Sequence, residues 1–248
     1  MQFVFLGGRP LGARCLREMI SRKLDIRLVV PNNDEFEEPL WFDSTAQIAK
    51  DAGLRVVRTA RINSELVDEI RAMHPDAILS IFFQQILKRP ILEAARLGCF
   101  NVHFAPLPRY RGFYPQMHAI INGEAVHGVT MHFMDEGIDT GDIVIQKSLP
   151  VLPTDTGKSL YMRCVDVGFD VFQTGLECIL REAIPRIPQD HQKATYYRKE
   201  IPNNREIDWS KSPEEILRFI RALTFAPFPP PYFRIGAQNF EVMGHEEE

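Results

Sequence analysis

The strongest constraint on the fold is the alternation of short apolar runs with helical segments through the first hundred residues. Residues 3–6 form an apolar run that ends at Gly7-Gly8, and residues 11–20 have the apolar spacing of a helix. Residues 26–30, IRLVV, are typical of a second strand, stopped by Pro31-Asn32-Asn33. A strand, a helix and a second strand in this order predict a parallel βαβ unit.

The same alternation continues to residue 180. Strands that alternate with helices predict an α/β fold: a doubly wound, Rossmann-like, mostly parallel sheet with helices on both faces. We expect helices at 44–51, 64–73, 89–95, 115–121 and 156–180, and strands at 54–57, 77–83, 99–103, 126–134 and 143–149.

The composition changes near residue 185. Prolines, the paired Tyr196-Tyr197 and polar loops surround one expected helix, 213–224, and an expected hairpin, 232–243. About sixty loop-rich residues have too small a core to fold alone. We therefore predict a main domain, 1–184, and a small C-terminal α+β subdomain, 185–248, packed on it.

Composition argues against several classes of protein. The formal charge of −4 and the pI near 6.0 disfavour a nucleic-acid partner. No apolar run approaches the roughly 20 residues of a membrane span and no secretory signal is evident, so we expect a cytoplasmic protein with no membrane partner. The four cysteines lack paired spacing, which favours reduced thiols. No metal is expected either, since no ligand frame connects His103, His118, His127 and His132.

The turn at residues 7–12, GGRPLG, lies between the first strand and the first helix, where backbone amides can face an anion. Its spacing is GGxxxG, whereas a dinucleotide fingerprint is GxGxxG, and no acidic residue stands at the tip of the second strand. Two interpretations stay open. The glycines permit a tight turn, or the turn contacts an anion with Arg9.

Residues 101–112, NVHFAPLPRYRG, put polar groups at the end of the strand 99–103. Asn101 and His103 are two residues apart, so they share a face at the edge where open α/β sheets bind ligands. The loop 134–142 carries four carboxylates, one of which could orient His103. The alternatives are a capping asparagine with a satisfied histidine, and a solvated turn.

Taken together, these segments resemble the folate-dependent formyltransferases. That family includes methionyl-tRNA formyltransferase, glycinamide ribonucleotide formyltransferase and the nucleotide-sugar N-formyltransferases. One departure is Ala105-Pro106, where family members usually carry Ser-Leu. The resemblance is carried by Asn101-x-His103, residues 107–112, 128–130 and 137–141, and more weakly by residues 207–210 and 220–223.

The resemblance implies N10-formyltetrahydrofolate as the formyl donor and a primary amine as the acceptor. Its implied catalytic residues are Asn101, His103 and Asp139. The implied folate slot is formed by Phe83, Gln84, Gln85 and Ile86 with Asp135, Gly137 and Ile138. Candidate contacts to the acceptor are Arg9, Tyr110, Arg111 and Gly112.

Among the family's acceptors, a nucleotide-linked amino sugar is expected, as in lipopolysaccharide O-antigen biosynthesis. The tail after residue 185 is shorter than the C-terminal barrel of the methionyl-tRNA enzyme, and the charge of −4 disfavours tRNA. The turn GGRP does not match the Gly-Ser-Asn loop of the glycinamide ribonucleotide enzyme.

A homodimer formed through the cluster 225–233 is also expected. Three alternatives stay open: a formyltransferase with another amine acceptor, a non-catalytic folate-binding module and, outside the class, a dinucleotide-dependent oxidoreductase.

Overall fold

The computed structural model describes residues 1–33, 40–242 and 244. They form two compact units, each assembled from separate stretches of chain. The first unit contains residues 1–103, 130–146 and 168–189, and the second contains the other described residues. The division into domains at residue 185 stays a prediction.

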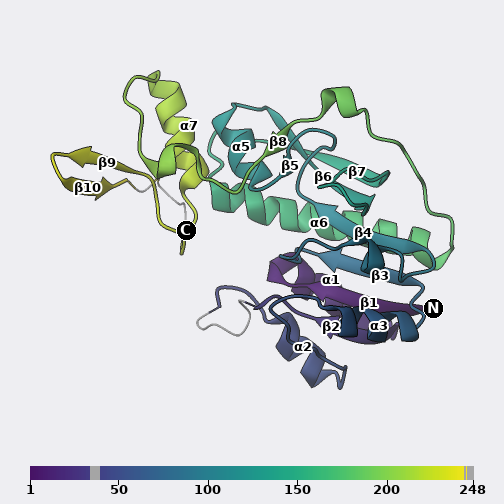
Figure 1. Cartoon of the computed structure of the whole chain (residues 1–248). Coiled ribbons are helices and arrows are strands. Elements are labelled where there is room, and N and C mark those ends of the chain that lie inside the picture. The colour runs from purple at the N-terminus through teal and green to yellow at the C-terminus, as the bar shows by residue number, and fades with distance from the viewer. Residues whose placement is uncertain (34–39, 243, 245–248) are drawn as a thin grey trace. The chain divides into compact units, whose positions relative to one another are not determined.

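A six-stranded sheet has the strand order β2-β1-β3-β4-β6-β7 (Figure 1). The pairs β1–β2, β1–β3 and β3–β4 are parallel, and β4–β6 is antiparallel. The predicted mostly parallel α/β sheet is therefore confirmed. Its strands are β1 (Gln2–Gly7), β2 (Asp25–Val30), β3 (Ala77–Ile81), β4 (Gly98–His103), β6 (Val126–Phe133) and β7 (Ile143–Pro150).

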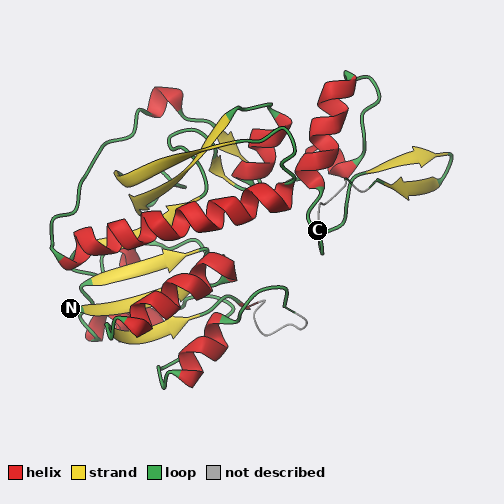
Figure 2. Ribbon diagram, turned by 180° about the vertical axis from the view of Figure 1, so that it is seen from behind, coloured by secondary structure: helices red, strands yellow, loops and turns green. Residues whose placement is uncertain are grey.

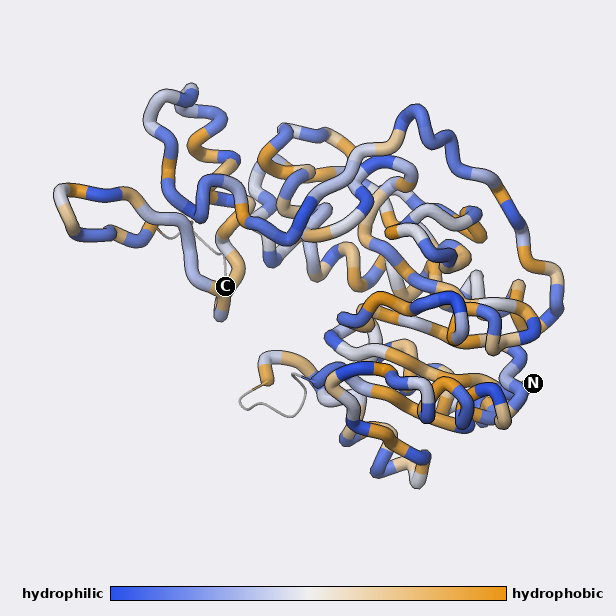
Figure 3. The backbone as a smooth tube through the Cα atoms, in the orientation of Figure 1, coloured by the Kyte–Doolittle hydropathy of each residue, from blue (hydrophilic) through white to orange (hydrophobic). Residues whose placement is uncertain are grey.

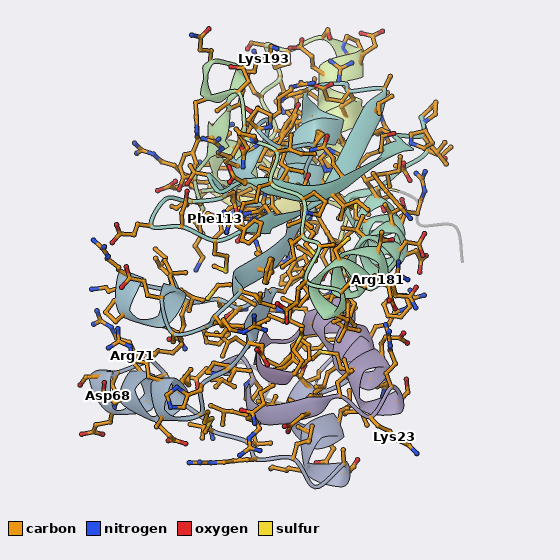
Figure 4. The ribbon with its side chains drawn as sticks, turned by 90° about the vertical axis from the view of Figure 1, so that its right-hand side faces the viewer. Lys23, Asp68, Arg71, Phe113, Arg181 and Lys193 are labelled. Atoms are coloured by element: carbon orange, nitrogen blue, oxygen red, sulfur yellow. The ribbon has the colours of Figure 1, made fainter. Side chains whose placement is uncertain are left out.

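One face of β1, β2 and β3 packs against α3 (Ser64–Ala72) and α4 (Arg89–Leu92). Asn63 caps α3, and Asp68 and Arg71 lie on the exposed side of that helix (Figure 4). Apolar side chains two residues apart on a strand share a face, so each strand presents an apolar surface to these two helices. Its buried residues include Val4, Leu6, Leu28, Val30 and Ile78 from strands and Leu66, Val67, Ile70 and Ile91 from helices.

The other face is covered by α1 (Arg9–Ser21) and the C-terminal part of α6 (Gly157–Leu180), the long helix in Figure 2. The two helices contact each other, since Gln173 donates to Glu18 over 3.2 Å. Gly175 of α6 lies against β6, where a side chain would strike a methionine sulfur. The strands between these helical layers run largely in orange in Figure 3, as expected for a sheet buried on both faces.

Two strand predictions were wrong in extent. The strand expected at 54–57 is reduced to one bridge, between Val56 and Val29. The strand expected to reach residue 83 ends at Ile81, because Phe82 has a left-handed φ of 54° that turns the chain out of the sheet. Among the helices of the described residues, none has both the length and the apolar character needed to cross a bilayer.

The second unit contains a parallel two-stranded pair that joins distant parts of the chain. Tyr197 in this pair stacks between two other rings, with centroids 5.2 Å from Tyr110 and 4.0 Å from His118. The Tyr110 hydroxyl donates to Glu124 over 2.7 Å. The elements here are β5 (Arg111–Gly112), α5 (Pro115–Ile121), η2 (His191–Lys193), β8 (Tyr196–Tyr197), η3 (Pro202–Arg205) and α7 (Pro213–Leu223).

The helix and the hairpin expected in the C-terminal part are confirmed. The hairpin consists of β9 (Tyr232–Ile235) and β10 (Gln238–Glu241), and its expected end at Met243 lies outside the described residues. The first unit also contains the helix α2 (Thr45–Asp51).

Gly7 is required where β1 meets β3. Its φ is 137°, and a Cβ there would lie 1.8 Å from the Ile81 carbonyl oxygen, to which Gly8 N donates over 3.1 Å. We expect Gly7→Ala to lower the free energy of unfolding by about 3 kcal/mol or more, because it adds a clash to the unfavourable φ.

The matched control is Gly53→Ala, with a φ of 69° and no atom within 4 Å of the added Cβ. The free energy of unfolding of this variant should fall by only about 1 to 2 kcal/mol, which is the cost of the left-handed backbone alone. Urea unfolding measures both variants. Equal losses in the two variants would show that the close approach to Ile81 is not a constraint.

His118 should make stability depend on pH. Burial lowers its pKa to about 4, whereas an unfolded histidine has a pKa of about 6.5. As pH falls from about 6.5 towards 4, the unfolded chain binds a proton that the native imidazole does not, so stability is lost in that window. His118→Phe keeps a ring beside Tyr197 without titrating. Urea unfolding at several pH values should show that the free energy of unfolding of this variant depends less on pH. An unchanged pH dependence would show that His118 is not the group responsible.

Candidate active site

Asn101 and His132 form the base of the site. They are directly opposite each other in the antiparallel pair β4–β6, so their side chains share one face of the sheet. The Asn101 Nδ2 lies 3.2 Å from His132 Nε2. His103 is two residues further along β4, on the same face, and is 9% exposed.

The environment of His132 fixes the orientation of the Asn101 amide. The His132 Nδ1 is 2.7 Å from the Phe133 carbonyl oxygen, which can only accept, so Nδ1 carries the proton. In the neutral ring, Nε2 then accepts from the Asn101 amide nitrogen. That nitrogen has two hydrogens, and its second one can serve as a donor to a ligand.

Asp139 brings a carboxylate to both histidines. Its Oδ2 lies 3.7 Å from His103 Nε2, and its Oδ1 lies 3.5 Å from His132 Nε2. The side chains of Asp139 and His103 are only 11% and 10% exposed. These distances are those of an ion pair when an imidazole is protonated, and the low exposure limits screening by solvent. The carboxylate therefore lies within ion-pair distance of the His103 ring.

Gln189 holds the Asp139 loop in place. Asp139 has a left-handed φ of 55°, a conformation that is uncommon outside glycine and is often found at functional sites. The buried Gln189 side chain donates to the Asp139 carbonyl oxygen over 2.9 Å and to the Gly141 carbonyl oxygen over 2.7 Å. It thereby fixes the backbone on both sides of residue 140.

Of the four carboxylates in this loop, Asp139 is the one that faces the histidines. The Asp135 side chain accepts from Gly137 N over 3.1 Å and closes a turn. Asp142 pairs with Arg186 over 3.3 Å, and Glu136 is exposed. The structure therefore brings together Asn101, His103 and Asp139, the three residues implied as catalytic.

His132 and Gln189 were missed as site residues. His132 was considered only as a metal ligand, and its contact with Asn101 depends on a cross-strand register that the sequence does not specify. Gln189 follows a proline-rich stretch and carries no motif. Within residues 1–33, 40–242 and 244, no three His, Cys, Asp or Glu side chains are grouped as metal ligands.

The predicted folate residues lie on two loops of the first unit. Phe83 is half-buried against the core, and Gln84 and Ile86 are exposed. The Gln85 side chain accepts from Ile62 N over 2.8 Å and donates to the Thr59 carbonyl oxygen over 3.2 Å. Asp135, Gly137 and Ile138 form the outer part of the Asp139 loop.

The predicted acceptor contacts are divided between the two units. The Arg9 guanidinium lies 5.1 Å from the centre of the Phe42 ring in the first unit. In the second unit, Arg111 is buried and donates to His191 Nδ1 over 3.1 Å. The remaining two, Tyr110 and Gly112, support the β5–β8 pair, where a Cβ on Gly112 would meet the Tyr197 carbonyl oxygen at 2.2 Å.

The comparison with known families decides the class of protein. The family described as Formyl transferase matches residues 1–176. The chain belongs to this family. A methionyl-tRNA formyltransferase from Halothermothrix orenii is 35% identical over 237 residues, covering 94% of the chain and 74% of the relative.

Two solved structures also match this formyl transferase. An N-formyltransferase from Helicobacter canadensis, in complex with folinic acid and dTDP-3-aminofucose, has a TM-score of 0.81 at 26% identity, covering 94% of this chain and 84% of that one. WlaRD, a sugar 3N-formyl transferase in the presence of dTDP and 5-N-formyl-THF, has a TM-score of 0.79 at 26% identity, covering 93% and 82%. The expectation of an enzyme of the folate-dependent formyltransferase family is confirmed, and the oxidoreductase alternative is not supported.

His132→Phe should lower kcat for formyl transfer by about tenfold or more, because the Asn101 amide loses the acceptor that orients it. His132→Gln should retain more activity than His132→Phe, because its amide oxygen can still accept from Asn101. Steady-state kinetics measure both. The control is His74→Gln, an exposed histidine after α3. Full activity of His132→Phe would show that the contact with Asn101 plays no part in turnover.

Proposed function

We propose that this enzyme transfers a formyl group from N10-formyltetrahydrofolate to the primary amine of a nucleotide-linked amino sugar. The observation that carries the proposal is the convergence of Asn101, His103 and Asp139 on one weakly exposed site. Hydrogen-bond donors, a titratable base and a fixed carboxylate are the groups that acyl transfer to an amine requires.

The chemistry assigns a role to each residue. When the neutral amine attacks the formyl carbon, negative charge develops on the formyl oxygen. The Asn101 amide and a protonated His103 can donate to that oxygen, and one such donor contributes about 3 to 4 kcal/mol in measured enzymes. If His103 begins neutral, it accepts the amine proton, donates to the formyl oxygen in that protonated form and then passes the proton to the departing folate nitrogen. If it begins protonated, a water accepts the amine proton and His103 gives its own proton to the folate nitrogen. Asp139 orients His103 and stabilises its charged form.

Folate as the donor is supported by the two solved relatives, whose structures contain folinic acid or 5-N-formyl-THF. In this chain, residues 83–86 and 135–138 would hold the pterin. Recognition through the backbone is consistent with the hydrogen bonds that the Gln85 and Asp135 side chains make to backbone amides of the protein itself. When bound, the folate supplies the formyl carbon that the amine attacks.

The acceptor is supported by structure and charge together. Both solved relatives are described with thymidine nucleotides, and one of them with an amino sugar. The formal charge of −4 disfavours a tRNA surface. The second candidate acceptor is methionyl-tRNA, which the 35% identical relative from Halothermothrix orenii favours. The amino sugar, its nucleotide and a place in O-antigen biosynthesis stay predictions.

An acceptor panel tests the proposal. The protein is incubated with N10-formyltetrahydrofolate and nucleotide-linked amino sugars, methionyl-tRNA or glycinamide ribonucleotide, and products are identified by the mass of one added formyl group. We expect release of tetrahydrofolate with an amino sugar and little with the other amines. Preferential formylation of methionyl-tRNA would replace the proposed acceptor, and no transfer to any amine would contradict catalysis.

A homodimer and a cytoplasmic location complete the proposal. The C-terminal part exposes aromatic rings: Trp209 is 65% exposed, Phe228 49% and Phe240 40%. Exposed apolar groups of this kind often mark an interface. Light scattering coupled to gel filtration would measure the subunit number.

A further inference from the structure

Asn32 is a buried amide that the proposed chemistry does not use. It lies two residues beyond the end of β2 and is 1% exposed. Its Nδ2 donates to the Phe82 carbonyl oxygen over 2.8 Å, and its Oδ1 accepts from Gln84 N over 3.0 Å. Both polar atoms of one buried side chain are therefore bonded to the short segment that leaves β3.

The architecture of the sheet explains how Asn32 reaches this segment. The strand order is β2-β1-β3, so β1 stands between Asn32 and the end of β3. β1 ends at Gly7, which has no side chain, and the next amide, Gly8 N, bonds to the Ile81 carbonyl oxygen. A Cβ on Gly7 would lie 1.8 Å from the Ile81 carbonyl oxygen, so glycine is needed where β1 ends beside the last residue of β3. This close approach favours the first interpretation of the turn GGRPLG, in which its glycines permit a tight turn.

The segment that Asn32 holds has a strained backbone. Phe82 has a left-handed φ of 54°, which costs a residue with a side chain about 1 to 2 kcal/mol. One hydrogen bond of Asn32 is made to the carbonyl oxygen of Phe82 itself, and the other to the amide of Gln84, two residues further on. On the far side, Gln85 bonds to the backbone of residues 59–62. Residues 82–85 are thus fixed at both ends by buried or half-buried amides.

We propose that Asn32 is a positioning residue for the formyl donor. It holds the backbone of residues 82–84 in the conformation that receives the pterin, an inference that rests on the proposed folate slot. A ligand read through backbone groups requires that backbone to be formed before binding. If the competent conformation is only partly populated, the apparent affinity falls by the same fraction. Loss of Asn32 should therefore weaken donor binding and leave the acceptor unaffected.

The test compares Asn32→Ala with Asn33→Ala in the full chain. Asn33 is the next residue and is exposed, so it is a matched control. Calorimetric titration with folinic acid gives the Kd for the donor analogue, and steady-state kinetics give separate KM values for donor and acceptor. We expect Asn32→Ala to raise the Kd for folinic acid and the KM for the donor at least tenfold, with the acceptor KM within about twofold. Asn33→Ala should behave as the unaltered protein.

A second variant separates a loss of donor binding from a loss of folding. Asn32→Asp has the same shape and can still accept from Gln84 N, but it cannot donate to the Phe82 carbonyl oxygen. It should show the same selective loss of donor affinity while thermal unfolding confirms a folded protein.

Three results would decide against the inference. Unchanged binding of folinic acid by folded Asn32 variants would overturn it, and so would equal weakening of donor and acceptor. If the unaltered protein failed to bind folinic acid, the folate slot itself would be wrong.

Discussion

The Asp139 carboxylate, held between two imidazoles with little exposure, is the contact on which the rest of the site depends. Its distances of 3.7 Å to His103 and 3.5 Å to His132 require three independent features of the fold. The sheet must place both histidines on one face, the loop must adopt a left-handed backbone at residue 139, and Gln189 must anchor that backbone. A carboxylate with so little solvent around it is stable only when the groups that face it are already in place in the folded protein.

The positions of both histidines come from paired strands in the interior of the sheet. Asn101, His103 and His132 stand on β4 and β6 in the interior of the sheet, so their positions follow from strand register and not from flexible loops. The segments proposed for folate are held by side-chain hydrogen bonds as well, residues 82–85 by those of Asn32 and Gln85 and residues 135–137 by the Asp135 turn. Preorganised donors and charges of this kind do not need to rearrange as the reaction proceeds.

The sequence was sufficient to predict the layers, because these depend on local pattern. The resemblance to a family implied Asn101, His103 and Asp139, and the structure brings these three residues together. Alternating apolar runs specify strands and helices, and the order of the Asn101-x-His103 and Gly137–Gly141 segments specifies the class of enzyme. The roles of His132, Gln189 and Asn32 could not be predicted, because each depends on contacts between residues 31 to 52 positions apart. The early end of β3 was missed for a similar reason: nothing in the residue type of Phe82 signals a left-handed φ.

The most direct test of the account is the rate of formyl transfer by Asp139→Asn, measured with saturating donor and acceptor beside Asp142→Asn. Asp142 belongs to the same loop but pairs with Arg186, away from the histidines. We expect a loss of about a hundredfold or more for Asp139→Asn, because His103, the acid–base group, loses the carboxylate that orients it, and nearly full activity for Asp142→Asn. Near-full turnover by a folded Asp139→Asn enzyme would contradict the central claim.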